Sequence, residues 1–229
     1  MKRGLSFLAL ACAAGFAASA HGAVTFTFFD PATGPEITYV EGSDNVTDPG
    51  EATWTGSNVA LTVDGTDEGL GQTTFANTAV SMFLEVGAVA DQEGGTFIAP
   101  ILSGMFSFTD MDSGMTLLTA TMGAEAGAVL ALGTTGNIIA QGGGGAGGLT
   151  FTAGSGLAAF LGGLTLGPIF DANFTLTNID PAATLSDNDF LEDFEANSAF
   201  TGNAEVIPSP GAIALAGLSL LTFAASRKR

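Results

Sequence analysis

The sequence predicts an all-β domain, an antiparallel β-sandwich or barrel-like sheet, over residues 24–205. Thr and Ser alternate with Phe, Leu and Val in short runs at residues 24–28, 61–63, 106–109, 149–152 and 174–177. Such alternation places apolar side chains on one face of a strand and hydroxyl groups on the other. Turn-forming residues separate the runs, as in Asp48-Pro49-Gly50 and Asp180-Pro181. Many short strands with turns between them are typical of sandwiches and barrels.

Three internal stretches depart from this alternation. Phe190, Leu191 and Phe194 recur at helical spacing, so residues 187–199 are predicted to form one short helix. Residues 120–131 are rich in Ala, but Gly123 and Gly127 disfavour a helix there. The glycine run at residues 142–148 precedes a predicted strand rather than a helix, which favours a flexible hairpin loop over a phosphate-binding loop.

Residues 1–23 have the three parts of a secretory signal peptide. Met1-Lys2-Arg3 is cationic, residues 5–18 are apolar apart from one Ser, and Ala18-Ser19-Ala20 is a small-x-small cleavage site. A second site, His21-Gly22-Ala23, is poorer because His is large. The apolar stretch is shorter than the roughly 20 residues of a membrane span. We therefore expect a signal helix that signal peptidase removes during export through the Sec translocon.

Residues 206–229 have the composition of a membrane-directed tail. Pro208-Ser209-Pro210 precedes an apolar run at residues 211–226, and the chain ends in Arg227, Lys228 and Arg229. As a helix, the sixteen residues of this run, all small or apolar apart from Ser219, Thr222 and Ser226, span about 24 Å, slightly less than the hydrocarbon core of a bilayer. The terminal cations favour the cytoplasmic side, which leaves the acidic middle of the chain outside. We therefore expect a transmembrane helix at residues 211–226.

The tail resembles the PEP-CTERM sorting signal of Gram-negative bacteria, whose members combine a Pro-Glu-Pro motif, a short apolar helix and a terminal basic cluster. Pro208 and Pro210 match the motif, whereas Ser209 stands where Glu is usual. The resemblance implies recognition by an exosortase, removal of the tail and export to the cell surface or an extracellular polymeric matrix. The central domain is loosely similar to β-rich domains found in such proteins. An ordinary C-terminal membrane anchor is the alternative.

The charges are strongly segregated along the chain. All five basic residues lie at the two ends, and all 23 acidic residues lie between Asp30 and Glu205. This acidity repels phosphate backbones and excludes nucleic-acid binding. Side-chain ion pairs with Lys or Arg cannot form within residues 24–205. We therefore expect mutual repulsion to raise the pKa values of clustered carboxyl groups, so that mild acid and salt stabilise the folded domain.

The acidic clusters are the candidate cation sites, because carboxylates in turns suit Ca²⁺. Solvated turn residues are the simpler interpretation, since none of the clusters matches an EF-hand loop. We therefore expect no resident cofactor and no metal site, with Ca²⁺ as the open alternative. The clusters are Asp44…Asp48, Asp64…Asp67-Glu68, Asp91…Glu93, Asp110…Asp112 and Asp187…Asp189…Glu192-Asp193.

Catalysis has few side chains available to it. His21 is the one His, Cys12 is the one Cys and lies in the signal segment, and residues 24–205 contain no Lys. Nucleophilic catalysis is therefore disfavoured. A glycosidase needs only two carboxylates, but sugar clefts use exposed aromatic residues, and Trp54 is predicted to be half-buried on a strand.

These observations favour an exported, non-enzymatic protein of the cell surface or extracellular matrix. We expect transient anchoring in the inner membrane, processing by an exosortase-type enzyme, and extracellular polysaccharide as the surrounding partner. A Ca²⁺-dependent adhesin or glycan-binding module is the first alternative, and a secreted glycosidase with paired carboxylates is the second.

Overall fold

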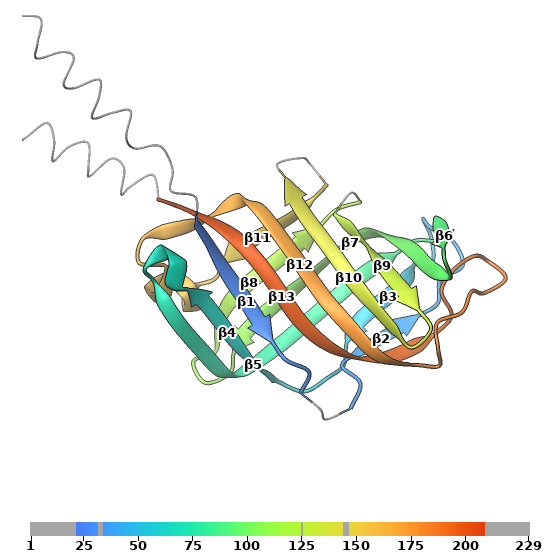
Figure 1. Ribbon diagram of the computed structural model, residues 1–229, viewed down its shortest axis with the longest axis horizontal. Helices are drawn as coiled ribbons and strands as arrows, with labels where there is room; N and C mark the ends of the chain where they lie inside the picture. The colour runs from blue at the N-terminus through green and yellow to red at the C-terminus, as the bar shows by residue number, and fades with distance from the viewer. Residues whose placement is uncertain (1–21, 32–33, 125, 144–146, 209–229) are drawn as a thin grey trace, which may run out of the picture.

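The computed structural model describes residues 22–31, 34–124, 126–143 and 147–208, which form one large antiparallel sheet (Figure 1). Its strands are β1 (Gly22–Phe28), β2 (Ile37–Val40), β3 (Gly50–Trp54), β4 (Val59–Gly65), β5 (Gly71–Val86), β6 (Asp91–Glu93), β7 (Thr96–Asp110), β8 (Met115–Met122), β9 (Gly127–Leu132), β10 (Thr135–Gly143), β11 (Leu149–Ala153), β12 (Leu164–Asp180) and β13 (Phe194–Pro208). Two short 3₁₀ helices, η1 (Thr66–Glu68) and η2 (Ser155–Leu157), and the four-residue helix α2 (Ala158–Leu161) complete the described elements.

The sheet closes on itself because the first strand pairs with the last. Strand β1 pairs with β13 from Gly22↔Val206 to Phe28↔Phe200, and with β4 on its other edge. The pairings continue from β4 through β5, β7, β9, β10 and β12 back to β13. Strands β2 and β3 bridge β13 and β5 beyond the end of β1. The described chain is thus an all-β, closed antiparallel fold.

Strand β8 extends this arrangement by pairing with β7, and β11 pairs with β8. The other edge of β11 lies beside the start of β12 without a hydrogen-bonded ladder. The glycine run connects β10 to β11, but these two strands do not pair with each other. Strand β10 pairs with β9 and β12, whereas β11 pairs with β8. The hairpin expected at residues 142–148 is wrong for this reason, although a strand does follow the glycines as predicted.

The interior is filled by the apolar faces of the predicted strands. All five alternating runs lie in strands, namely β1, β4, β7, β11 and β12, which confirms the all-β prediction. Their Phe side chains meet in one cluster, in which Phe106 lies 5.1 Å from Phe174 and 5.5 Å from Phe200 between ring centroids. Phe28 joins the cluster from β1, with its ring 5.7 Å from that of Phe200.

The short helix predicted at residues 187–199 is wrong. Strand β13 begins at Phe194, and a bridge between Leu185 and Leu191 holds the preceding loop. From Phe194 onward the buried residues alternate with more exposed ones, as they do in a strand that lies between neighbours. Three strands, β2, β12 and β1, take up the hydrogen bonds of β13, so no helix can form there.

The Ala-rich stretch is also strand rather than helix, as its glycines indicated. It covers the end of β8 and the first five residues of β9. At Gly127 a Cβ atom would overlap the backbone carbonyl oxygen of Ile139 on β10. Glycine therefore allows the two strands to approach at this point.

The two helices expected at residues 5–18 and 211–226 lie outside the described residues. Among the residues that the structure does describe, none forms a helix of the length and apolarity needed to span a membrane. The sheet includes Gly22 and Ala23, which the sequence placed with the signal peptide, and residues 206–208, which it placed with the tail.

Candidate functional site

Both ends of the described chain leave the sheet at one corner (Figure 1). Gly22 pairs with Val206, and the last residue of β13, Pro208, pairs with Leu164 of β12. Pro208 is the one predicted sorting-signal residue inside the described chain. Ser209, Pro210, Arg227, Lys228 and Arg229 lie outside it, as do the predicted cleavage-site residues Ala18 and Ala20.

A hollow of about 260 Å³ lies at this corner, and Gly22, Ala23 and Ile169 supply its apolar lining. Its polar lining comes from Asp171, Asn203 and Glu205, on the outward faces of β12 and β13. The Asn203 side chain accepts a hydrogen bond from the Thr25 hydroxyl at 2.9 Å and donates one to Asp171 at 2.8 Å. Period-two alternation points these polar side chains outward while their neighbours fill the core.

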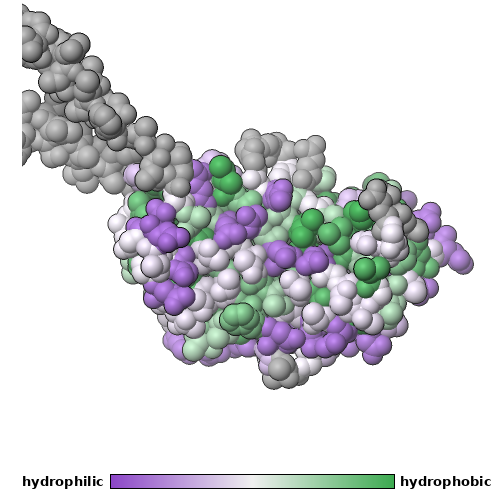
Figure 2. Space-filling view, in the orientation of Figure 1, coloured by the Kyte–Doolittle hydropathy of each residue, from purple (hydrophilic) through white to green (hydrophobic). Residues whose placement is uncertain are grey.

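The hollow continues a row of hydrophilic residues that crosses the sheet. The row follows cross-strand partners from Gln72 on β5 to Gln141 on β10, through Asp64, Thr25, Asn203 and Asp171. Figure 2 shows hydrophilic side chains spread among neutral ones over this face. The row contains hydroxyl, amide and carboxylate groups but no cationic side chain. It can therefore form hydrogen bonds but offers no positive charge to a ligand.

An apolar groove lies near the same corner, where β11 faces β12 without pairing. Two adjoining hollows of about 350 Å³ each share Phe151 and Leu166, and Ile207 lines the second. Leu161 and Leu164 line the first hollow, which makes the groove predominantly apolar.

Three of the acidic clusters are turns in which an aspartate accepts hydrogen bonds from its own loop. Asp44 accepts the backbone N–H groups of Val46 and Thr47, at 2.8 and 2.9 Å. The Asp64 carboxylate accepts hydrogen bonds from the hydroxyl and the backbone N–H of Thr66. These bonds stabilise the ionised carboxylates and lower the pKa values of Asp44 and Asp64.

Asp110 forms the third such turn. Its carboxylate accepts the Ser113 hydroxyl and the backbone N–H groups of Asp112 and Ser113. The Ser113 hydroxyl is the largest cause of the lowered pKa of Asp110. The expectation that clustering raises carboxyl pKa values is therefore wrong for these three aspartates, because local hydrogen bonds outweigh the repulsion.

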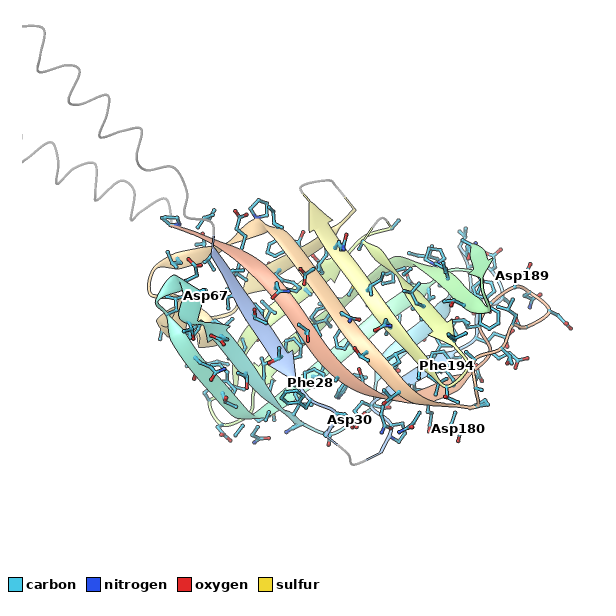
Figure 3. The ribbon with its side chains drawn as sticks, in the orientation of Figure 1. Phe28, Asp30, Asp67, Asp180, Asp189 and Phe194 are labelled. Atoms are coloured by element: carbon cyan, nitrogen blue, oxygen red, sulfur yellow. The ribbon has the colours of Figure 1, made fainter. Side chains whose placement is uncertain are left out.

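The densest acidic cluster lies at the opposite end of the domain, where Figure 3 labels Asp189. Asp193 accepts the backbone N–H of Glu41 at 2.6 Å, and Glu192 accepts the hydroxyl of Thr184. Within the described ranges, no group of three or more His, Cys, Asp or Glu side chains is arranged to hold a metal ion. The carboxylates of Asp193 and Glu192 thus serve as hydrogen-bond acceptors for loop residues.

Glu36 is a buried carboxyl group that the sequence did not single out. It immediately precedes β2, is fully buried, and accepts the backbone N–H of Ser198 at 2.8 Å through Oε2. Its Oε1 is buried without a hydrogen-bond partner. Burial raises the pKa of Glu36, and the charge of Asp30 acts in the same direction. This burial arises from contacts with Ala196 and Ser198 on β13, which lie far from Glu36 in the sequence.

The aromatic residues that could stack on sugars mostly face the core. Trp54 is half-buried, as predicted, with its indole N–H donated to the Gly56 carbonyl at 3.2 Å. Tyr39 is buried and stacks on Phe194 at 5.0 Å, and burial raises the pKa of its hydroxyl. Phe29, which is 88% exposed, is an exception that the sequence did not predict.

No family model, no curated protein and no solved structure matches this chain.

We expect millimolar Ca²⁺ to raise the melting temperature no further than NaCl does at equal ionic strength. Several of the clustered carboxylates already bond within their own loops, so binding a cation would break those bonds. If a specific site exists, a free Ca²⁺ concentration of 100 times its Kd would add about 2.7 kcal/mol to the free energy of unfolding, which thermal melting detects readily. A gain in stability of that size with Ca²⁺, but not with NaCl at equal ionic strength, would favour the alternative that the protein is a Ca²⁺-dependent adhesin.

Proposed function

We propose that the chain is an exported, non-enzymatic protein of the cell surface or extracellular matrix, processed at both ends. Its N-terminal segment directs export through the Sec translocon, and its C-terminal segment anchors it transiently in the inner membrane. An exosortase-type enzyme then removes the tail. A signal helix and a membrane helix would flank the closed sheet, and the mature domain would lie among extracellular polysaccharides.

The observation that carries the proposal is the common exit of the two chain ends. Because Gly22 pairs with Val206, residues 1–21 and 209–229 are attached to the same corner of the folded sheet. A folded domain can therefore keep both apolar segments directed at one membrane while its bulk remains on one side. Only Ser209 and Pro210 separate the sheet from the apolar run at residues 211–226, so a membrane helix in that run would hold the domain close to the membrane surface.

The composition of the described chain supports a non-enzymatic role. It contains no Lys, Arg, His or Cys, and the polar side chains that line the hollow at the corner are two carboxylates and an amide. Glu36, the buried carboxyl group, opens into none of the hollows described above. We therefore propose structural and interaction roles rather than chemistry.

The test compares intact masses of the protein from cells with and without a functional exosortase. We expect the wild-type product to lack residues 1–20 and the terminal Arg229, and the exosortase-deficient cells to retain the tail in the membrane fraction. A matched control ends the chain at Pro208, which keeps all of β13. This shortened chain should be released in both strains. Equal masses of the full-length chain in the two strains, with Arg229 present, would contradict the proposal.

A further inference from the structure

An uncharged hollow of about 320 Å³ lies on the outer face of the sheet, over β9, β10 and β12. In this part of the sheet, Figure 2 shows hydrophobic surface beside neutral surface. The outward side chains of the hollow come from two rows of cross-strand partners, which are Leu130–Asn137–Thr175 and Leu132–Thr135–Thr177.

The hollow is apolar on one side and polar on the other. Leu130 and Leu132 supply the apolar side from β9, and Leu132 is 50% exposed. Hydroxyl and amide groups on β10 and β12 supply the polar side. Ligand sites combine apolar contact with a few polar groups that fix orientation. A pyranose ring matches this division, because its C–H groups form apolar faces and its hydroxyl groups project from the edges.

The polar side of the hollow has hydrogen-bonding capacity to spare. Within the described part of the chain, the side chains of Asn137, Thr175 and Thr177 form no hydrogen bond. The corner differs, because there Asn203 both accepts and donates one. Two residues before Thr175, on the same face of β12, Oδ1 of Asn173 is buried without a hydrogen-bond partner. Unsatisfied donors and acceptors are therefore concentrated around the hollow.

Charge also separates this hollow from the rest of the surface. Its lining contains no ionisable side chain, although the chain has 23 acidic residues. The described residues contain no Lys or Arg, so the domain repels an anionic polymer. A cationic polymer is attracted instead to carboxylates such as Asp171 and Glu205 at the corner. The lining therefore matches a neutral ligand.

A row of threonines extends the polar surface from the hollow across the sheet. Thr62, Thr27 and Thr201 face one another on β4, β1 and β13, and Thr201 faces Asn173 on β12. Neighbouring strands lie about 4.8 Å apart, so the row presents polar groups at regular intervals. Regular spacing suits a ligand built of repeating units.

We propose that the hollow and the adjoining threonine row bind a neutral, linear polysaccharide on the outer face of the sheet. The sugar rings pack their C–H faces on Leu130 and Leu132, and their hydroxyl groups bond with Asn137, Thr175 and Thr177. The inference rests on the proposed location of the domain among extracellular polysaccharides. It adds the face that binds and the class of polymer that is bound.

The test uses protein purified from the producing cells and the polysaccharide that these cells release, separated by anion exchange into neutral and acidic fractions. We expect the neutral fraction to retard the protein in native gels, and added NaCl to leave this retardation unchanged. Thr175→Val removes one hydroxyl and should weaken binding about 2- to 12-fold, the usual effect of losing a neutral hydrogen bond. Leu132→Ser should weaken binding from the apolar side. The matched control is Thr121→Val, at an exposed position on β8 outside the hollow.

Failure of the neutral fraction to bind, or equal affinities for Thr175→Val and Thr121→Val, would overturn the site. Preferential binding of the acidic fraction, or salt-sensitive binding of a cationic polymer such as partly deacetylated chitin, would also overturn it. Intact mass of the same sample tests the export route separately. Protein that retains Arg229 and still binds the neutral fraction would refute the processing and support the site.

Discussion

Replacing Phe106 by Ala is expected to lower the free energy of unfolding by about 3–5 kcal/mol. Its side chain is fully buried, and its ring lies 5.7 Å from Phe108, 6.0 Å from Phe151, 5.1 Å from Phe174 and 5.5 Å from Phe200. These neighbours come from β7, β11, β12 and β13, so none can move into the space without displacing a paired strand. The loss therefore combines transfer free energy with the cost of a cavity.

For a domain of this size, that loss corresponds to a fall in melting temperature of roughly 6–20 °C. The matched control is Phe83→Ala on β5, which removes the same atoms from a side chain that is 41% exposed beside Met105. It should cost far less than Phe106→Ala. Thermal and urea unfolding of the exported protein provide both values. Equal losses for the two variants would show that the Phe cluster does not form the core.

The second large effect is a rise in stability on mild acidification that depends on Glu36. Burial raises its folded pKa above the ordinary value of 4.5, so the folded state binds this proton more readily than the unfolded chain. Stability from this group therefore increases as pH falls through the raised pKa, and the increase is complete below about pH 4.5. One group contributes at most about 1.4 kcal/mol per pH unit, or roughly 3–5 °C of melting temperature.

Asp44, Asp64 and Asp110 act in the opposite direction at lower pH. Their folded pKa values lie below the ordinary 3.8, so the stability they contribute is present above that pH and is lost as pH falls through the lowered values. We therefore expect the melting temperature to rise from pH 7 towards pH 4.5 and to fall again below pH 3.8.

Glu36→Gln tests the origin of the rise. The amide oxygen still accepts the Ser198 N–H, but no proton is taken up, so the increase between pH 7 and pH 4.5 should shrink. Glu195→Gln removes an exposed carboxylate from β13 and controls for the loss of one negative charge. A pH profile of Glu36→Gln that superimposes on that of Glu195→Gln would refute the assignment to Glu36.

The sequence predicted the strands that carry large apolar residues at alternate positions, such as Phe106 and Phe108 in β7. It failed at the start of β13, where the buried positions after Phe194 are occupied by the small residues Ala196 and Ser198. Small residues carry little hydropathy signal, so the helical spacing of Phe190, Leu191 and Phe194 dominated the local pattern. The closure of the sheet imposed an extended conformation that the local sequence did not favour.

The candidate site was predictable only in part. The export signals are local patterns, and they stay predictions because their key residues lie outside the described chain. The meeting of Gly22 with Val206 depends on a pairing between residues far apart in sequence, which periodicity cannot show. The lowered pKa values of Asp44 and Asp64 arise from hydrogen bonds within their turns, whereas the density of charge along the sequence predicts raised values.

The pairing of β1 with β13 also governs how quickly the domain can form. The hydrogen bond between Thr25 and Asn203 joins residues 178 positions apart, so the ring cannot close until nearly the whole domain has been synthesised. Folding rates fall as such long-range contacts come to dominate a topology. In the export route proposed above, slow closure of the sheet would let the extended polypeptide cross the membrane pore before it folds.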